Sequence, residues 1–143
     1  MSSSTSNNIF STTRTHIAAL SIKEIATQFN TPTFVYDAEV ILRRVAELSE
    51  FDVVRYAQKA NSNLAILAMM KEQGVVLDAV SAGEIHRALR VGYHGGSNAN
   101  RRHEIVYTAD IFDQDALELV QEHNIHVNCG SVDMIEQLGK VSP

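Results

Sequence analysis

The chain has 143 residues, a formal net charge of −5 and one cysteine. Its length suits one ordinary domain, and 45% hydrophobic with 20% charged residues is typical of a globular protein. The negative charge argues against a nucleic-acid partner, and no apolar run reaches the ~18 residues that cross a membrane.

The N-terminal stretch is mostly Ser, Thr and Asn. We expect residues 1–20 to form a disordered tail and residues 21–143 to form the first part of a folded domain. A transit peptide is the alternative for the tail, because no acidic residue precedes Glu24. Such peptides are richer in arginine than this stretch, which holds only Arg14.

Local signals predict two helices and one strand before residue 50. Ser21 begins a capping-box pattern with a glutamate three residues later, which predicts a helix over 22–28. Pro32 disfavours helix in the residue before it, and the β-branched and aromatic run 33–36 predicts a strand. Asp37 then predicts the N-cap of a second helix with an apolar stripe.

From residue 53 onward, an apolar run, an amphipathic stretch and a Gly or Asn follow one another repeatedly. Continuous apolar runs are typical of parallel strands that are buried on both faces. The predicted strands cover 53–57, 75–80, 104–108 and 125–129. The predicted helices cover 64–73, 82–90, 114–123 and 132–138. We expect them to end at Gly74, Gly92, Asn124 and Gly139.

Successive β-α units fit either a doubly wound open sheet or a (β/α)8 TIM barrel. No G-x-G-x-x-G motif follows the first of these strands, where Lys59 stands instead. The chain stops where a further strand is due, whereas a barrel needs about 200 residues or more. We therefore expect an α/β fold that is the front part of a longer enzyme.

Lys59 follows an apolar strand, at the edge of a parallel sheet where ligands bind. The small residues Ala57 and Ala60 flank it and leave room for a planar ligand. A partly desolvated lysine amine can form a Schiff base with an aldehyde. A solvated surface lysine remains the alternative from the residues alone.

Two sequence blocks carry a resemblance to a known family. Residues 56–61, Tyr-Ala-Gln-Lys-Ala-Asn, resemble the pyridoxal-phosphate signature of the group IV, fold-type III decarboxylases, which are the alanine-racemase-like enzymes. Residues 77–84, Leu-Asp-Ala-Val-Ser-Ala-Gly-Glu, resemble the next block of that family, and residues 31–37 look like its N-terminal strand and helix entry. The blocks look most like the diaminopimelate decarboxylase branch.

The resemblance implies a pyridoxal 5'-phosphate-binding TIM barrel, cut here after about four β-α units, with the family's C-terminal β-domain absent. Lys59 would be the catalytic lysine that holds the cofactor. Ala57, Asp78 and Glu84 would lie at the cofactor. The family's glycine-rich phosphate segment and its ring-stacking histidine have no counterpart in these residues.

Asp78 and Glu84 also have local interpretations. Asp78 stands near a strand end, where a carboxylate often bonds to neighbouring groups. Glu84 follows Ser81 at the capping-box spacing and would accept a hydrogen bond from the N-cap amide. The capping and site interpretations of Glu84 are compatible, and both remain open.

We expect no metal site. His86, His103, His123 and His126 show no ligand spacing, and Cys129 stands where a buried apolar residue is expected. A single cysteine excludes an intramolecular disulfide and favours a reducing compartment, for which we expect the cytoplasm.

The resemblance implies, for the full-length enzyme, decarboxylation of meso-2,6-diaminopimelate to L-lysine by a homodimer, with no membrane or nucleic-acid partner. These 143 residues alone are expected to be inactive. The alternatives are an ornithine- or arginine-type decarboxylase, a racemase of the same fold type, a non-catalytic pyridoxal-phosphate-binding barrel protein, and a plain nucleotide-binding α/β module.

Overall fold

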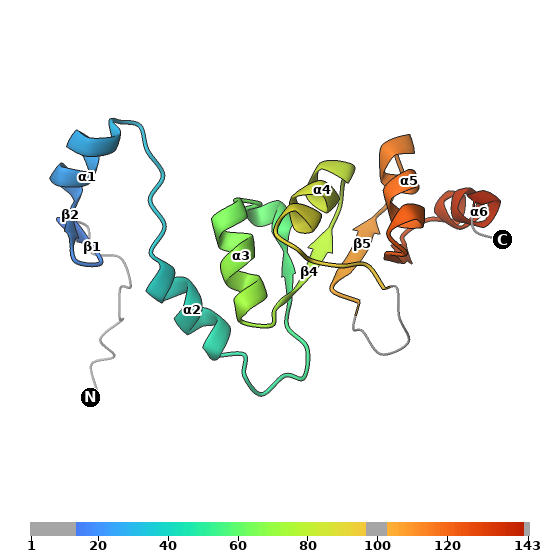
Figure 1. Cartoon of the computed structure of the whole chain (residues 1–143), viewed down its shortest axis with the longest axis horizontal. Helices are drawn as coiled ribbons and strands as arrows, with labels where there is room; N and C mark the ends of the chain where they lie inside the picture. The colour runs from blue at the N-terminus through green and yellow to red at the C-terminus, as the bar shows by residue number, and fades with distance from the viewer. Residues whose placement is uncertain (1–13, 97–102, 142–143) are drawn as a thin grey trace, which may run out of the picture. The chain divides into compact units, whose positions relative to one another are not determined.

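The computed structural model describes residues 14–96 and 103–141 (Figure 1). Two compact units divide the chain, residues 1–47 and residues 48–143. All the residues predicted for the cofactor site belong to the second unit, which also holds the parallel sheet.

The first unit contains a short hairpin and two helices. Its elements are β1 (His16–Ile17), β2 (Leu20–Ser21), α1 (Ile22–Phe29) and α2 (Ala38–Ala46). The Glu24 carboxylate accepts a hydrogen bond from the Ser21 amide at 3.4 Å, as the capping-box pattern predicts. The Asp37 side chain accepts bonds from the amides of Glu39 and Val40, which confirms it as the N-cap of α2.

Two features of the first unit differ from the sequence predictions. Ordered structure begins before residue 21, because β1 and β2 pair antiparallel within the expected tail; residues 1–13 lie outside the described residues. The run 33–36 is not a strand, and Phe34 within it is 91% exposed. A strand requires a neighbouring strand to bond with, and none of the described strands pairs with this run.

The second unit is built on a four-stranded parallel sheet in the order β3-β4-β5-β6. The strands are β3 (Arg55–Ala57), β4 (Val76–Ala79), β5 (Ile105–Ala109) and β6 (His126–Cys129). The helices are η1 (Gln58–Ala60), α3 (Leu64–Glu72), α4 (Ala82–Arg90), α5 (Gln114–Glu122) and α6 (Val132–Val141). Chain order and spatial order are therefore the same, as in the wall of a barrel.

Repeated caps explain why three helices begin where predicted and end within one residue of the predicted position. The side chains of Asn63, Ser81 and Asp113 accept backbone bonds at the N-termini of α3, α4 and α5. Each of these helices is followed by a residue with positive φ: Gly74, Gly92 or Asn124. The amide of the next residue then bonds back five positions, as from Val75 to the Met70 carbonyl at 3.0 Å. This Schellman geometry turns α3 and α5 directly into β4 and β6, whereas a longer connection separates α4 from β5.

The expected end of the last helix at Gly139 is wrong. Helix α6 continues to Val141. Gly139 does not have the positive φ of Gly74 and Gly92, so it is an ordinary helical residue here. Glycine permits a helix stop without enforcing one.

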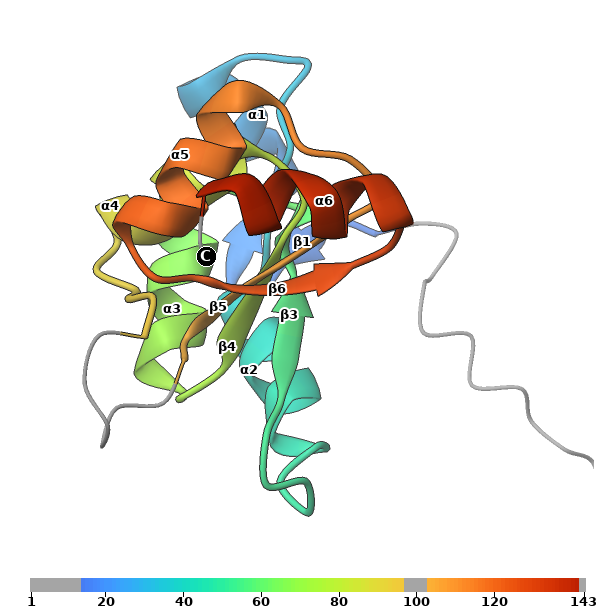
Figure 2. The same cartoon turned by 90° about the vertical axis from the view of Figure 1, so that its right-hand side faces the viewer.

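One face of the sheet packs against the helices. Helices α3, α4 and α5 lie along one side of the strands (Figure 2). Strand residues that alternate along β4 and β5 join helix residues in a single buried cluster. Its strand members are Leu77, Ala79, Ile105 and Tyr107, and its helix members include Leu67, Ile85, Ala88, Ala116, Leu119, Val120 and Met134. A doubly wound sheet carries helices on both faces, whereas a barrel wall carries them on its outer face alone. The structure thus favours the barrel prediction.

Candidate cofactor site

Lys59 lies in η1, immediately after the C-terminal end of β3. Its side chain is exposed and takes part in no ion pair among the described residues. Hydrogen bonds fix the loop that follows: the Tyr56 hydroxyl donates to the Asn61 carbonyl at 2.9 Å, and the Asn63 amide donates to the Asn61 side chain at 3.0 Å. The amine of Lys59 is therefore accessible to a ligand, and hydrogen bonds hold the backbone of the loop that follows it.

Ala57 and Asp78 are register partners on β3 and β4. Partner residues of paired strands place their side chains on the same face, so the small Ala57 leaves open space beside the half-buried Asp78. Within the described residues, no ion pair joins Asp78 to Lys59. The structure brings Ala57 and Asp78 together and places Lys59 two residues beyond Ala57, at the same end of the sheet.

Asp78 belongs to a hydrogen-bonded row that crosses three strands. The Thr108 hydroxyl on β5 donates to Asp78 Oδ1 at 2.9 Å. The Asn128 amide on β6 donates to Thr108 Oγ1 at 3.2 Å. These three side chains are the Asp78–Thr108–Asn128 row, and sequence reasoning did not identify its last two members.

Glu84 supports the turn between β4 and α4. Its carboxylate accepts a bond from the Val80 amide at 2.9 Å, and its own amide donates to Ser81 Oγ at 3.3 Å. The expected bond from Glu84 to the N-cap amide is therefore replaced by one to the preceding amide. This geometry bears out a local role for Glu84, and its part in cofactor binding stays a prediction.

Tyr107 lies near the same turn, on the helix-covered face. Its hydroxyl donates to the Ile111 carbonyl at 2.9 Å. Burial raises the pKa of Tyr107 above its usual value, and the carboxylates of Asp113 and Glu84 add to this effect. The hydroxyl therefore stays a hydrogen-bond donor at neutral pH and holds the β5–α5 loop.

Gln58, next to Lys59, is a feature that the sequence did not signal. The side chain is fully buried, and neither amide atom has a hydrogen-bond partner among the described residues. A buried amide without partners is costly. Within the described residues, Gln58 is therefore a local source of instability.

The sheet also brings two histidines together. The rings of His103 and His126 stack with their centroids 3.2 Å apart, because β5 and β6 are neighbours. Desolvation by burial lowers the pKa of His103 below its usual value, and the charges of His126 and Arg55 lower it further.

Residues 14–96 and 103–141 contain no group of three His, Cys, Asp or Glu side chains that could hold a metal ion.

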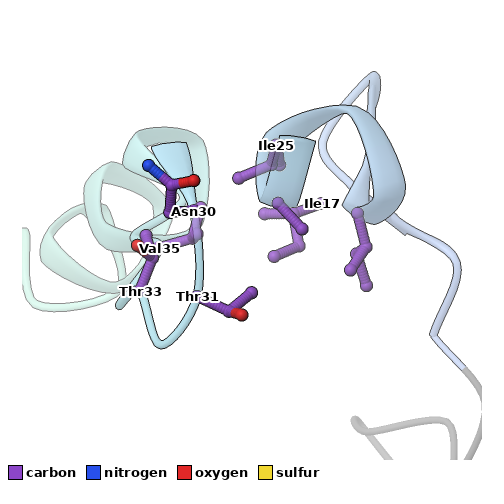
Figure 3. Close-up of a pocket in the computed structure, with 8 residues that line it drawn as sticks. Ile17, Ile25, Asn30, Thr31, Thr33 and Val35 are labelled. Atoms are coloured by element: carbon purple, nitrogen blue, oxygen red, sulfur yellow. The ribbon is translucent and has the colours of Figure 1, made fainter. Parts of the chain in front are cut away.

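A small apolar pocket lies in the first unit rather than beside Lys59 (Figure 3). Its volume is about 190 Å³, and the residues that line it are Ile17, Ile22, Ile25, Ala26, Asn30, Thr31, Thr33 and Val35. None of the predicted site residues lines it.

In the part of the chain that the structure describes, no helix is long and apolar enough to span a bilayer.

Comparison with known proteins identifies the family. Residues 38–143 match the family model described as "Pyridoxal-dependent decarboxylase, pyridoxal binding domain". The chain belongs to the pyridoxal-dependent decarboxylases. Its match to the pyridoxal-binding domain confirms the resemblance and the cofactor that it implied.

The similar proteins include diaminopimelate decarboxylases. The Escherichia coli (strain K12) enzyme is 50% identical over 137 residues, which cover 96% of this chain and 32% of that protein. A crystal structure of diaminopimelate decarboxylase superposes with a TM-score of 0.78 at 53% identity, over 84% of this chain and 28% of that one. The crystal structure of the Helicobacter pylori diaminopimelate decarboxylase complexed with L-lysine has a TM-score of 0.65 at 27% identity. The match covers 82% of this chain and 30% of that one. The chain thus spans about a third of the length of these relatives, and the prediction of a partial barrel is confirmed.

The residues present fit a pyridoxal cofactor. Lys59 offers an exposed amine at the C-terminal end of a barrel strand, which is the end where barrel enzymes bind their ligands. Ala57 leaves space beside it, and Asp78 supplies a half-buried carboxylate that accepts a hydrogen bond from Thr108. An amine with a carboxylate at the same end of the sheet suits a ligand that carries an aldehyde.

Proposed function

We propose that this chain supplies the cofactor-lysine part of a diaminopimelate decarboxylase, which converts meso-2,6-diaminopimelate to L-lysine. The observation that carries the proposal is Lys59, exposed and without an ion pair among the described residues, at the C-terminal end of β3 within the matched family domain. The identity of 50% to the Escherichia coli enzyme supports this substrate over the related amino acids.

The chain's own residues have distinct tasks in this reaction. Pyridoxal phosphate, when bound, supplies an electron sink for the electron pair left on the substrate's α-carbon when carbon dioxide departs. Lys59 would hold the cofactor through Nζ and would carry a proton at that atom whenever its amine is free. Asp78 provides negative charge beside the site, and Glu84 holds the β4–α4 turn in place.

A chimera gives a direct test. In it, this chain replaces the matching 137 residues of the Escherichia coli enzyme, which supplies the rest of the barrel and the second domain. We expect the chimera to release carbon dioxide from diaminopimelate and to form L-lysine. Borohydride reduction with pyridoxal phosphate should attach the cofactor to Lys59, as read by peptide mass mapping.

The matched controls are two lysine substitutions. Lys59→Ala should abolish both labelling and decarboxylation, whereas Lys140→Ala, at an exposed position of α6, should leave both intact. A folded chimera that carries its label elsewhere, or that keeps its activity without Lys59, would show that the proposal is wrong.

Three finer features complete the proposal. We infer that the full-length enzyme is a homodimer in the cytoplasm and that these 143 residues alone do not decarboxylate. The family resemblance supports the dimer, and the low cysteine count supports the compartment. The coverage of only 32% of the Escherichia coli relative supports inactivity of the isolated chain.

A further inference from the structure

The Asp78–Thr108–Asn128 row lies on the face of the sheet opposite the helix-packed cluster. Side chains alternate between the faces of a strand, and Leu77, Ala79 and Tyr107 face the helices. Asp78 and Thr108 therefore face the other side, which is the interior side of a barrel wall.

This face changes character along the strands. Val76 and Val106 are buried and apolar, at 3% and 8% exposure. Two residues further toward the C-terminal ends stand Asp78 and Thr108, which are polar and only half-buried. Barrel interiors are usually filled by branched apolar residues, and ligands bind beyond them at the C-terminal ends. The row thus begins where the packed interior gives way to the site of Lys59.

The chemistry of the row fixes its direction. An amide nitrogen can only donate, so the bond from Asn128 occupies a lone pair of Thr108 Oγ1. The single proton of the threonine hydroxyl then points to Asp78 Oδ1. Among the described residues, no hydrogen-bond donor contacts the other carboxylate oxygen, Oδ2, which is left for a ligand.

Folding alone gives little reason for this arrangement. Asparagine is depleted in strands, and Asn128 is exposed in the middle of β6. The net stability that one hydrogen bond adds is small, and an apolar β-branched residue would favour the strand more.

We propose that Thr108 and Asn128 are positioning residues that hold the Asp78 carboxylate in one orientation toward the pyridoxal cofactor. This inference rests on the proposed function. Hydrogen bonds to a charged group are stronger than those between neutral groups, so the loss of the Thr108 hydroxyl frees the carboxylate to rotate away. Cofactor affinity should fall as a result.

The test measures the dissociation constant for pyridoxal phosphate in the chimera, from the extent of borohydride-fixed label on Lys59 at increasing cofactor concentration. Thr108→Val keeps the shape of the side chain and should raise the dissociation constant about tenfold, or about 1.4 kcal/mol. Thr108→Ser retains the hydroxyl and should stay within about twofold of the unsubstituted chimera. Thr27→Val is the control, since the Thr27 hydroxyl donates to the Lys23 carbonyl within α1 and has no other hydrogen-bond partner among residues 14–96 and 103–141.

A double-mutant cycle separates positioning from general support of the fold. On an Asp78→Asn background, Thr108→Val should have almost no further effect on affinity, because its action passes through the carboxylate. Urea midpoints, measured in parallel, should be similar for Thr108→Val and Thr108→Ser.

Several results would overturn the inference. If the unsubstituted chimera labels Lys59 and Thr108→Val leaves the dissociation constant unchanged, the inference is wrong and the proposed function stands. A Thr108→Val effect of full size on the Asp78→Asn background would show that Thr108 acts independently of Asp78. If the unsubstituted chimera takes up no cofactor at Lys59, the proposed function fails and this inference fails with it.

Discussion

Tyr93 anchors the start of the α4–β5 connection to the core, and its hydroxyl offers a sharp test of the fold. The residue is 1% exposed, and its hydroxyl donates to the Val75 carbonyl at 2.9 Å, with the Leu67 carbonyl 3.3 Å away. Burial and, to a smaller extent, Glu104 raise the pKa of Tyr93 above its usual value, so the hydroxyl remains a donor. Tyr93→Phe removes only this oxygen and leaves the Val75 carbonyl without this donor.

The expected loss in the free energy of unfolding is about 1–3 kcal/mol, the range for a buried polar group that loses its partner. Urea unfolding of the chain, followed by circular dichroism, measures it. Tyr36→Phe is the matched control, because Tyr36 is 53% exposed and should change stability by less than about 0.5 kcal/mol. A Tyr93→Phe effect as small as that of the control would refute the reasoning.

Two further predictions concern His103 and Gln58. Folding lowers the pKa of His103, so this imidazole binds a proton more readily in the unfolded chain than in the folded one. The free energy of unfolding should therefore fall as the pH drops below about 6.5. The difference between the denaturant midpoints at pH 7.5 and pH 5.5 should be smaller in His103→Asn than in the unsubstituted chain. An unaltered pH dependence in that variant would contradict this. Gln58→Met removes two buried polar atoms that have no hydrogen-bond partner among the described residues. This substitution should raise the free energy of unfolding by about 1–3 kcal/mol. A lower free energy of unfolding would mean that the amide is bound by a group outside the described residues.

Local features of the chain were predictable because their signals are local. The N-caps Asn63, Ser81 and Asp113 and the left-handed residues that end the helices act within one helical turn. Lys59 was found in the same way, because the position of a lysine after an apolar run depends on neighbouring residues alone. Its family signature then implied the cofactor chemistry that we propose for it.

Features that depend on pairing between distant segments were not predictable. The run 33–36 has strand composition but no partner strand within the described residues, so it stays irregular. The contact between His103 and His126 follows from the adjacency of β5 and β6. Gln58 is buried because the short η1 helix packs beside β4, which no pattern around Gln58 indicates.

The Asp78–Thr108–Asn128 row shows how register creates a site that sequence alone conceals. Asp78 is paired with Val106 rather than with Thr108, which lies two residues further along β5. Thr108 and Asn128, by contrast, are direct partners. The Thr108 hydroxyl therefore reaches Asp78 diagonally, across a step toward the C-terminal end. Diagonal neighbours on paired strands come within reach of each other's side chains, so the pairing of β4 with β5 brings a hydroxyl from the next strand to the carboxylate. Sequence alone does not reveal which strands pair, so the row becomes visible only in the folded sheet.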